Sequence, residues 1–481
     1  MSGTRVLRAA IVAACVSLAV SAEAQEGWEA APATLSAPAA TGGAIGVPRL
    51  AVDGLGNAVA AWLQRISSSE ALVKVSRREA GSGTWSPPAT LAGPIATSGS
   101  LEIAADAQGH ALAVWSAVSA SGTAVMAARF EAGSGTWQPA VMLSATGGAA
   151  DLAMNQGGQA VAAWTDAAGL AAARYDTTGG TWVAPATITS DRPFSARLGV
   201  DAAGNAIVVW QTAVGEPVEA SRSEAGTSVW SAPAVLSPAL PGPGLAGATL
   251  AVGASGDAVA AWTNGTALEA AHYDAAAPGW SAATTLSTGG LSNNAARAAV
   301  DGAGRATLVW LNTSPTLRKM HVARWDPAGS AWSAAAELPG QDAGFAYNGA
   351  IDVDDGGNVH VVWSQSLASP GLRLLASRYA TSTSTWTTVS NLSAMGQSAY
   401  NPDVAVDPHG NAVAIWFQVL SGTSAIEGLR WSAAPAPLRH HGRHTGEWDA
   451  DAHGQPAARG RSVAAGGHEP RALPRRRQRR G

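Results

Sequence analysis

The sequence predicts an all-β fold, an eight-bladed β-propeller of four-stranded antiparallel blades, from three observations. A tryptophan recurs eight times at intervals of 46 to 53 residues, as Trp62, Trp115, Trp164, Trp210, Trp262, Trp310, Trp363 and Trp416. A glycine stands six residues before each of them, and an aspartate stands nine before most of them. Short apolar segments flank this glycine, so each copy opens with two strands joined by a tight turn. Eight copies with a period of about 50 residues are typical of a propeller with one blade per copy.

Each copy continues with a third and a fourth strand. The third strand ends in segments such as "SRRE", "ARFE" and "ARYD", and the fourth begins at segments such as "TWSPP". The fourth strands carry a second tryptophan series, Trp28, Trp85, Trp137, Trp182, Trp230, Trp280, Trp332 and Trp386. We expect both tryptophan series to pack blade against blade in the core.

The two ends of the repeat predict how the ring closes. The segment "GWEAAPATLSA" near the N-terminus is a fourth strand without a preceding blade, and the last copy stops after its third strand near Trp431. Joining them completes the eighth blade and leaves no open sheet edge. This closure resembles that of many β-propeller proteins.

The repeated aspartate and glycine predict a turn. Asp53 and Gly56 illustrate the pattern: the carboxylate accepts backbone N–H groups, and the glycine supplies a positive φ. A calcium ion requires six to eight oxygen ligands, more than one such turn offers. One turn is an exception and a weak metal candidate, because Asp352, Asp354 and Asp355 lie close together in the sequence.

Functional residues are expected where the copies differ. Thirteen residues before the first tryptophan series, at the start of the strand that lines the central channel, stand Arg49, Glu102, Asp151, Arg197, Arg297 and Asp403. Three residues earlier, in the connecting loops, stand Phe194, Tyr347 and Tyr400. Aromatic faces beside carboxylate and guanidinium groups suit a sugar or a polar polymer at the channel mouth. In the alternative interpretation the tyrosines fill gaps between blades and the charges pair with one another.

No nucleophile elbow, P-loop, HExxH or paired CxxC motif occurs, so the sequence favours a noncatalytic protein without a cofactor. The "GSGTW" turns distantly resemble the Asp-box turns of sialidase-type propellers, and the repeat is also similar to kelch-type propellers. The glycine spacing departs from the Asp-box pattern. The resemblance implies a site of three arginines, Arg49, Arg197 and Arg297, with Tyr400 and Glu102. Glu102 and Asp151 are then the alternative carboxylate pair of a glycan hydrolase or lyase.

The chain divides into a signal peptide at 1–24, a propeller at 25–437 and a tail at 438–481. Basic residues, an apolar run and Ala22-Glu23-Ala24 predict cleavage near Ala24 and export to the cell surface, the periplasm or the medium. Cys15, the single cysteine, offers lipid anchoring as an alternative. No later apolar run is long enough to cross a bilayer.

The tail shows none of the repeat and holds ten of the 30 Lys and Arg residues. We expect it to be disordered, and a frameshift in the gene is one interpretation of its origin.

These features predict an exported, noncatalytic binding or adhesion module. The expected partner is an extracellular glycan or a surface protein, with no nucleic acid, and the expected state is a monomer. Glycan hydrolase or lyase chemistry is the first alternative, and a purely structural surface repeat is the second.

Overall fold

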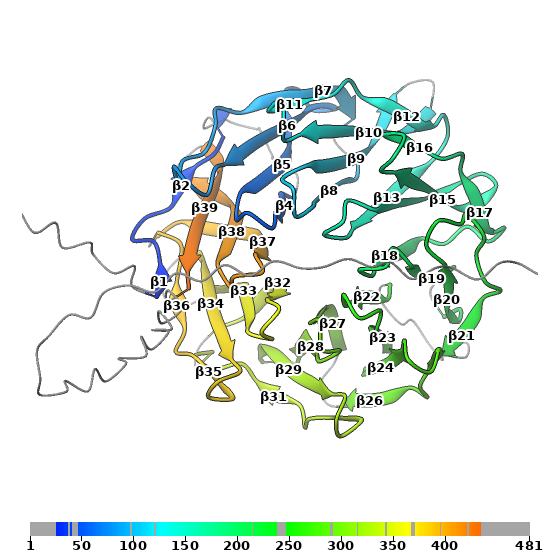
Figure 1. Cartoon of the computed structure of the whole chain (residues 1–481). Helices are drawn as coiled ribbons and strands as arrows, with labels where there is room; N and C mark the ends of the chain where they lie inside the picture. Colours follow the sequence, from blue (N-terminus) through cyan, green and yellow to red (C-terminus); the bar gives the residue numbers. More distant parts are fainter. Residues whose placement is uncertain are drawn as a thin grey trace, which may run out of the picture. The chain divides into compact units, whose positions relative to one another are not determined.

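The protein was analysed as a computed structural model that describes residues 26–36, 39–40, 47–96, 99–119, 122–213, 215–237, 247–288, 292–314, 316–341, 344–366, 371–394, 396–420 and 423–433. These ranges contain strands and turns, and none of them contains a helix. They form eight antiparallel sheets arranged in a ring (Figure 1). The predicted eight-bladed β-propeller is therefore confirmed. The predicted signal peptide and tail lie outside the described residues.

Each blade has three long strands at its centre. The innermost strands of blades 1 to 8 are β4 (Arg49–Val52), β8 (Leu101–Ala105), β13 (Gly148–Met154), β18 (Ser195–Val200), β22 (Thr249–Val252), β27 (Ser292–Val300), β32 (Ala346–Val353) and β37 (Ser398–Val406). The second strands are β5 (Ala58–Arg65), β9 (Ala111–Ser119), β14 (Ala160–Asp166), β19 (Ala206–Gln211), β23 (Ala258–Asn264), β28 (Ala306–Thr313), β33 (Val359–Ser366) and β38 (Ala412–Leu420).

The third strands are β6 (Glu70–Arg78), β10 (Gly122–Glu131), β15 (Gly169–Asp176), β20 (Val218–Ser223), β24 (Ala267–Asp274), β29 (Arg318–Asp326), β34 (Leu372–Ala380) and β39 (Thr423–Ser432). The outer edge is a single strand in blade 1, β7 (Ala89–Ala96), and in blade 4, β21 (Ala234–Ser237). In five other blades it is split into β11 (Thr136–Trp137) and β12 (Val141–Ser144), β16 (Thr181–Trp182) and β17 (Ala186–Thr189), β25 (Gly279–Trp280) and β26 (Thr284–Ser287), β30 (Ala331–Trp332) and β31 (Ala336–Glu337), and β35 (Thr385–Trp386) and β36 (Ser390–Asn391).

The ring closes as predicted. The N-terminal segments β1 (Gly27–Trp28), β2 (Ala33–Thr34) and β3 (Ala39–Ala40) all pair antiparallel with β39, the third strand of blade 8. Innermost strand β37 of this blade contacts β4 of blade 1, as each other innermost strand contacts the next. One sheet therefore combines the first and the last described strands of the ring.

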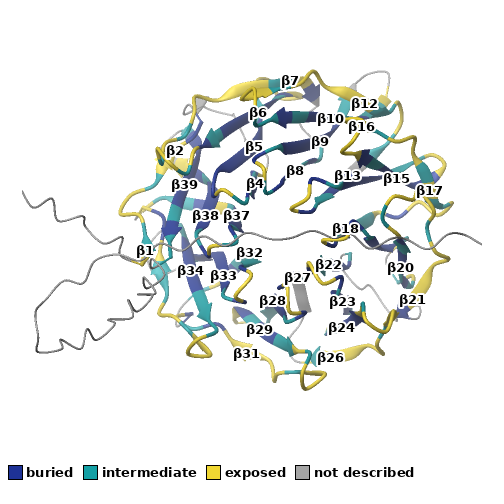
Figure 2. Ribbon diagram, viewed as in Figure 1, coloured by how far each residue is buried: buried dark blue, intermediate teal, exposed yellow. Residues whose placement is uncertain are grey.

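The second strands carry the core, and their sequences explain why. Segments such as "AVAAW" are almost wholly apolar because a blade in a ring is covered by a neighbour on both faces. Every tryptophan of the first series lies in one of these strands and is at most 2% exposed. Figure 2 shows the buried residues on the inner strands and the exposed residues along the outer edges. Small alanines such as Ala60, which is fully buried, let the blades approach closely.

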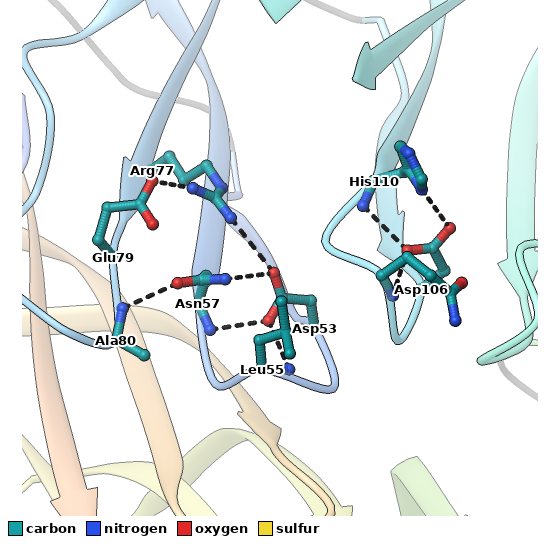
Figure 3. Close-up of polar contacts among 9 residues, drawn as sticks. Asp53, Leu55, Asn57, Arg77, Glu79, Ala80, Asp106 and His110 are labelled. Atoms are coloured by element: carbon teal, nitrogen blue, oxygen red, sulfur yellow. Dashed lines mark hydrogen bonds and ion pairs between the residues drawn. The ribbon is translucent and has the colours of Figure 1, made fainter. Parts of the chain in front are cut away.

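The repeated aspartate has the predicted turn role (Figure 3). One oxygen of the Asp53 carboxylate accepts the backbone N–H groups of Leu55 and Asn57 at 2.9 and 2.8 Å, and the other accepts the Asn57 side-chain amide at 2.8 Å. Gly56 has φ of 80°. A Cβ at Gly56 would lie 3.0 Å from Oδ2 of Asp407, the equivalent aspartate of blade 8. Glycine is therefore needed here both for its backbone conformation and for the close approach of two blades.

The two blades that depart from the Asp pattern keep the turn by exchanging partners. In blade 3, Asn155 takes the place of the aspartate and donates to the side chain of Gln159 at 2.9 Å. In blade 5 the aspartate is replaced by Gly253, and Asp257 stands where Asn57 stands in blade 1. Asp257 accepts the backbone N–H of Ala275 at 3.0 Å, as Asn57 accepts that of Ala80 in blade 1. The turn therefore needs a hydrogen-bonding side chain at these positions but not a carboxylate at a fixed place: blade 3 forms it with the two amides Asn155 and Gln159.

Candidate functional site

The six charged residues of the predicted column occupy equivalent positions in six innermost strands. Each lies opposite the residue that precedes a first-series tryptophan: the pairs are Arg49 with Ala61, Glu102 with Val114, Asp151 with Ala163, Arg197 with Val209, Arg297 with Val309, and Asp403 with Ile415. Electrostatic interactions link all six residues, so they share one central region of the ring. We call this region the channel site.

One close ion pair lies within the channel site. Nε of Arg49 in blade 1 lies 2.9 Å from Oε2 of Glu102 in blade 2. The same Nε donates to the Leu101 carbonyl at 3.2 Å. The side chains of Arg49 and Glu102 remain 34% and 24% exposed. This pair therefore links two blades while both groups stay accessible from the channel.

The two aspartates of the channel site join neighbouring blades. One oxygen of Asp403 accepts the backbone N–H of Val404, and the other accepts that of Leu50 in blade 1, at 2.9 Å. Asp151 does the same between blades 3 and 4, accepting the N–H of Leu198 at 2.9 Å. Both carboxylates thus serve the scaffold, and the ligand-binding role predicted for them stays a prediction.

Arg197 and Arg297 differ from Arg49 in having no carboxylate within ion-pair distance, although from farther away Arg197 opposes the rise that burial causes in the pKa of Asp151, and Arg297 opposes that of Asp403. Each donates one hydrogen bond, at 2.9 Å, to the carbonyl of the residue before it, Ala196 or Ala296. Both arginines are exposed, and neither forms an ion pair with any described residue. The channel site therefore holds two guanidinium groups whose remaining donors are free to bind a ligand.

The charges of the channel site influence one another. Burial raises the pKa of Glu102 to about 7, against the opposing effect of Arg49. Burial also raises the pKa of Asp151 and of Asp403. The pKa of Arg297 is lowered by desolvation inside the ring, although the side chain stays accessible to solvent, and then by the positive charges of Arg197 and Arg49. The carboxylates therefore take up protons while the arginines stay charged. As the pH falls, the net charge of the channel site becomes positive.

The predicted aromatic residues lie at the start of the innermost strands, and each tyrosine packs near a partner that the sequence did not indicate. The guanidinium of Arg318 lies 5.6 Å from the ring centre of Tyr347. The rings of Tyr400 and Phe417 are 6.3 Å apart, and Tyr400 is 38% exposed. No described contact joins either tyrosine to Asp403 or Arg49, the neighbours that the sequence suggested.

A hydrogen bond nevertheless brings the loops of these two tyrosines together. The residues that follow them, Asn348 in blade 7 and Asn401 in blade 8, are bonded side chain to side chain at 3.0 Å. The repeated "AYN" in the two blades was the sequence signal for this contact. Phe194 stands by itself on blade 4, exposed, three residues before Arg197. The aromatic part of the site is therefore centred on blades 7 and 8.

The weak metal candidate consists of residues with other roles. Asp352 accepts the backbone N–H groups of Val353 and, in the next blade, of Val406 at 2.7 Å. Asp354 accepts both the backbone and side-chain N–H groups of Asn358. With the exposed Asp355 they line a cavity of about 410 Å³ near the ends of the innermost strands. Within the described ranges no three acidic, histidine or cysteine side chains are placed to hold a metal ion.

No helix in the described part of the chain has the length and apolar character to cross a bilayer.

Comparison with known proteins supports the fold and gives no family. No protein-family model matches the chain, and no curated protein sequence matches it. Among solved structures it is similar to a polysaccharide lyase, the ulvan lyase bound to -[GlcA(1-4)Rha3S]-, with a TM-score of 0.51, 10% identity, and coverage of 82% of this chain and 95% of that one. The Dos1 propeller gives the same TM-score and identity, with coverage of 82% and 94%. The NanB sialidase of Streptococcus pneumoniae has a TM-score of 0.39 and 12% identity, with coverage of 82% of this chain and 70% of that one. At these identities the likeness shows the propeller fold alone.

Proposed function

We propose that the protein is an exported, noncatalytic propeller that binds an acidic glycan at the channel site. The observation that carries the proposal is the pair of exposed guanidinium groups, Arg197 and Arg297, which have no carboxylate partner in the described structure. Unpaired positive charge inside a ring of protein attracts anions more strongly than the same charge on an open surface. Planar guanidinium groups also match carboxylate and sulfate oxygens.

The aromatic residues favour a sugar over a simple anion. Tyr400 is exposed next to Phe417, and Tyr347 lies under Arg318 at the same end of the innermost strands. A pyranose ring can stack on such a face while its acidic group reaches an arginine. Ulvan, the ligand of one structural neighbour, carries both uronate and sulfate groups, and it illustrates the class of polymer that we have in mind.

Glycan cleavage is the second candidate function, because one group in the channel site has the pKa that proton transfer requires. Glu102 has a pKa raised to about 7, near the value suited to a general acid or base at neutral pH. Asp151, its candidate partner, has both carboxylate oxygens bonded to backbone N–H groups. That arrangement suits a structural role better than a nucleophile, and it favours binding over catalysis.

A glycan array carrying uronate, sulfate and sialate oligosaccharides beside neutral ones tests the proposal. We expect the mature chain to retain acidic glycans and the Arg197→Ala plus Arg297→Ala double variant to lose them. Retention of the same glycans by the double variant would contradict the proposal. Release of shortened products that stops in Glu102→Gln would instead support the catalytic candidate.

A further inference from the structure

The second tryptophan series differs from the first in a way that the sequence did not reveal. Both series were expected in the core, but only the first is buried throughout. All members of the second series are half-buried on the outer parts of the blades: Trp28, Trp85, Trp137, Trp182, Trp230, Trp280, Trp332 and Trp386. A large apolar ring left partly in water in every blade has an exposed face that core packing does not explain.

These rings line grooves between neighbouring blades. Among the described residues, cavities open at the interfaces of blades 1 and 2, 2 and 3, 4 and 5, and 6 and 7, with volumes of about 950, 320, 700 and 670 Å³. The range of volumes is that of ordinary ligand pockets. In each, the second-series tryptophan of the later blade forms part of the wall: Trp137, Trp182, Trp280 and Trp386. We call these cavities the rim grooves.

Each rim groove contains an aromatic corner. The later blade supplies a third-strand ring packed near the tryptophan at a steep angle, as with Phe130 and Trp137, whose ring centres are 5.7 Å apart at 59°. Tyr175 and Trp182 are 5.4 Å apart at 70°, and the remaining two grooves repeat the arrangement with Tyr273 and Trp280 and with Tyr379 and Trp386. The inner ring is buried in three of the grooves, at Phe130, Tyr175 and Tyr273, and half-buried at Tyr379. The tryptophan is therefore the more accessible wall of the corner.

The earlier blade supplies paired charges to the same groove. Arg77 lies over the Phe130 ring, with its guanidinium carbon 5.1 Å from the ring centre, and forms an ion pair with Glu79. Arg129 likewise lies over Tyr175 and pairs with Glu131. Because each arginine has its own carboxylate, these two grooves offer hydrogen-bond donors and acceptors with little net charge. That combination suits hydroxyl groups rather than an anion.

The aromatic corner is not a requirement of blade packing. At the interface of blades 3 and 4 the inner ring is replaced by Ser223, and Arg174 donates to its backbone carbonyl at 3.0 Å instead. At the interface of blades 8 and 1 the equivalent residue is Arg78, which pairs with Glu29. The ring therefore closes at these two interfaces without an aromatic corner.

From these observations we propose that the rim grooves bind neutral pyranose residues, with the apolar face of the sugar stacked on the second-series tryptophan. In three grooves an arginine paired with a carboxylate, Arg77 with Glu79, Arg129 with Glu131 and Arg222 with Glu224, then binds the sugar hydroxyls. In the groove between blades 6 and 7 Arg324 takes this role by itself. Repetition around the ring makes the protein multivalent for a neutral polysaccharide, and avidity follows from several weak sites on one polymer. The rim grooves are separate from the channel site, and this proposal does not depend on the channel site binding acidic glycans.

Isothermal titration with three neutral hexasaccharides, cellohexaose, chitohexaose and mannohexaose, tests the proposal on the full mature chain. We expect at least one to bind with a stoichiometry of about four and to quench tryptophan fluorescence. Trp137→Ala is expected to remove one site, and alanine at Trp137, Trp182, Trp280 and Trp386 together to remove all four. Trp137→Phe retains an aromatic face and is expected to keep its site with affinity reduced about tenfold or less.

Several outcomes would overturn the proposal. The proposal is wrong if the wild-type chain binds none of the three hexasaccharides. It is also wrong if Trp137→Ala still melts cooperatively and binds the sugar with the stoichiometry of the wild type. Self-association that disappears in the same variant, without sugar binding, would assign the grooves to a second copy of the chain. The channel variant Arg197→Ala plus Arg297→Ala separates the two sites, because it is expected to lose acidic glycans and to keep the neutral hexasaccharides.

Discussion

Trp28 of β1 lies opposite Trp431 of β39, so the two ends of the described chain share the outer edge of blade 8. Ion pairs extend this contact to both neighbouring blades. Glu29 pairs with Arg78 of blade 1 at 2.7 Å, and Glu26 pairs with Arg378 of blade 7 at 2.9 Å. The N-terminal segment therefore holds three consecutive blades together.

Removing the closing tryptophan should weaken the whole ring. We expect Trp28→Ala to lower the free energy of unfolding by about 2 kcal/mol, since a half-buried ring is lost. Trp28→Phe should recover part of that loss. Thermal and denaturant unfolding followed by circular dichroism measure both changes, and equal stability of Trp28→Ala and the wild type would show that closure does not depend on this strand.

A buried histidine beside the closure predicts loss of stability in acid. The His360 ring lies 4.7 Å from that of Trp431, its Nε2 is buried without a hydrogen-bond partner, and burial lowers its pKa to about 3. The unfolded chain binds a proton at its ordinary pKa of 6.5, so stability contributed by neutral His360 is lost as the pH falls from 6.5 toward 3. The slope from this group is about 1.4 kcal/mol per pH unit.

His360→Phe keeps a ring and removes the proton site, so its stability should fall less steeply below pH 6.5 than that of the wild type. Other groups also make stability depend on pH: Glu102 and Asp352 have pKa values raised to about 7, so the stability that they contribute is lost as the pH rises. Both proteins contain these two groups, so the difference between their curves reports on His360 alone. Parallel curves for the two proteins would refute the assignment to His360.

The turn network predicts a large difference between two aspartates. Asp53→Ala removes three hydrogen bonds of the turn and the ion pair with Arg77, and it leaves the Asn57 N–H buried without its acceptor, so we expect a loss of about 2 kcal/mol. Asp355→Ala, at an exposed position of another turn, should cost less than about 0.5 kcal/mol. Urea titration measures the free energy of unfolding of both variants. Equal losses in the two would show that the hydrogen bonds of Asp53 do not stabilise the turn.

Glu102 should make binding of acidic glycans depend on pH. As the pH falls through about 7, protonation of Glu102 leaves Arg49 without its counter-charge and the channel site more positive. We expect affinity for hexagalacturonate to rise severalfold from pH 8 to pH 6, where the uronate stays ionised. Glu102→Gln should bind strongly across this range, and a wild-type affinity that does not change would exclude this role for Glu102.

The fold was predictable because the repeat is required in every blade. Trp62 and its seven equivalents must fill the same space, and Gly56 and its equivalents must make the same turn, so both recur at a fixed spacing. The equivalent placement of Arg49, Glu102 and Arg197 followed from that spacing.

The contacts of the site were less predictable because they depend on side-chain positions that the repeat does not fix. The spacing does not show that the Arg318 guanidinium lies over Tyr347 of the next blade, or that the Tyr400 ring packs near Phe417 of the paired strand. Asp403 and Leu50 lie at opposite ends of the repeat, so their hydrogen bond depends on ring closure. The partial exposure of the second tryptophan series could not be predicted either, because a series of exposed tryptophans and a series of buried ones recur at the same spacing in the sequence. Such features depend on how neighbouring blades meet.

The most direct test of the account is the affinity of hexagalacturonate for Arg197→Ala plus Arg297→Ala, measured by isothermal titration at pH 6. The matched control is Lys74→Ala plus Arg430→Ala, which removes the same charge from third strands β6 and β39. We expect a loss of affinity of at least about a hundredfold in the channel variant and little change in the control. Equal affinity in the two variants, or no binding by the wild type, would contradict this expectation.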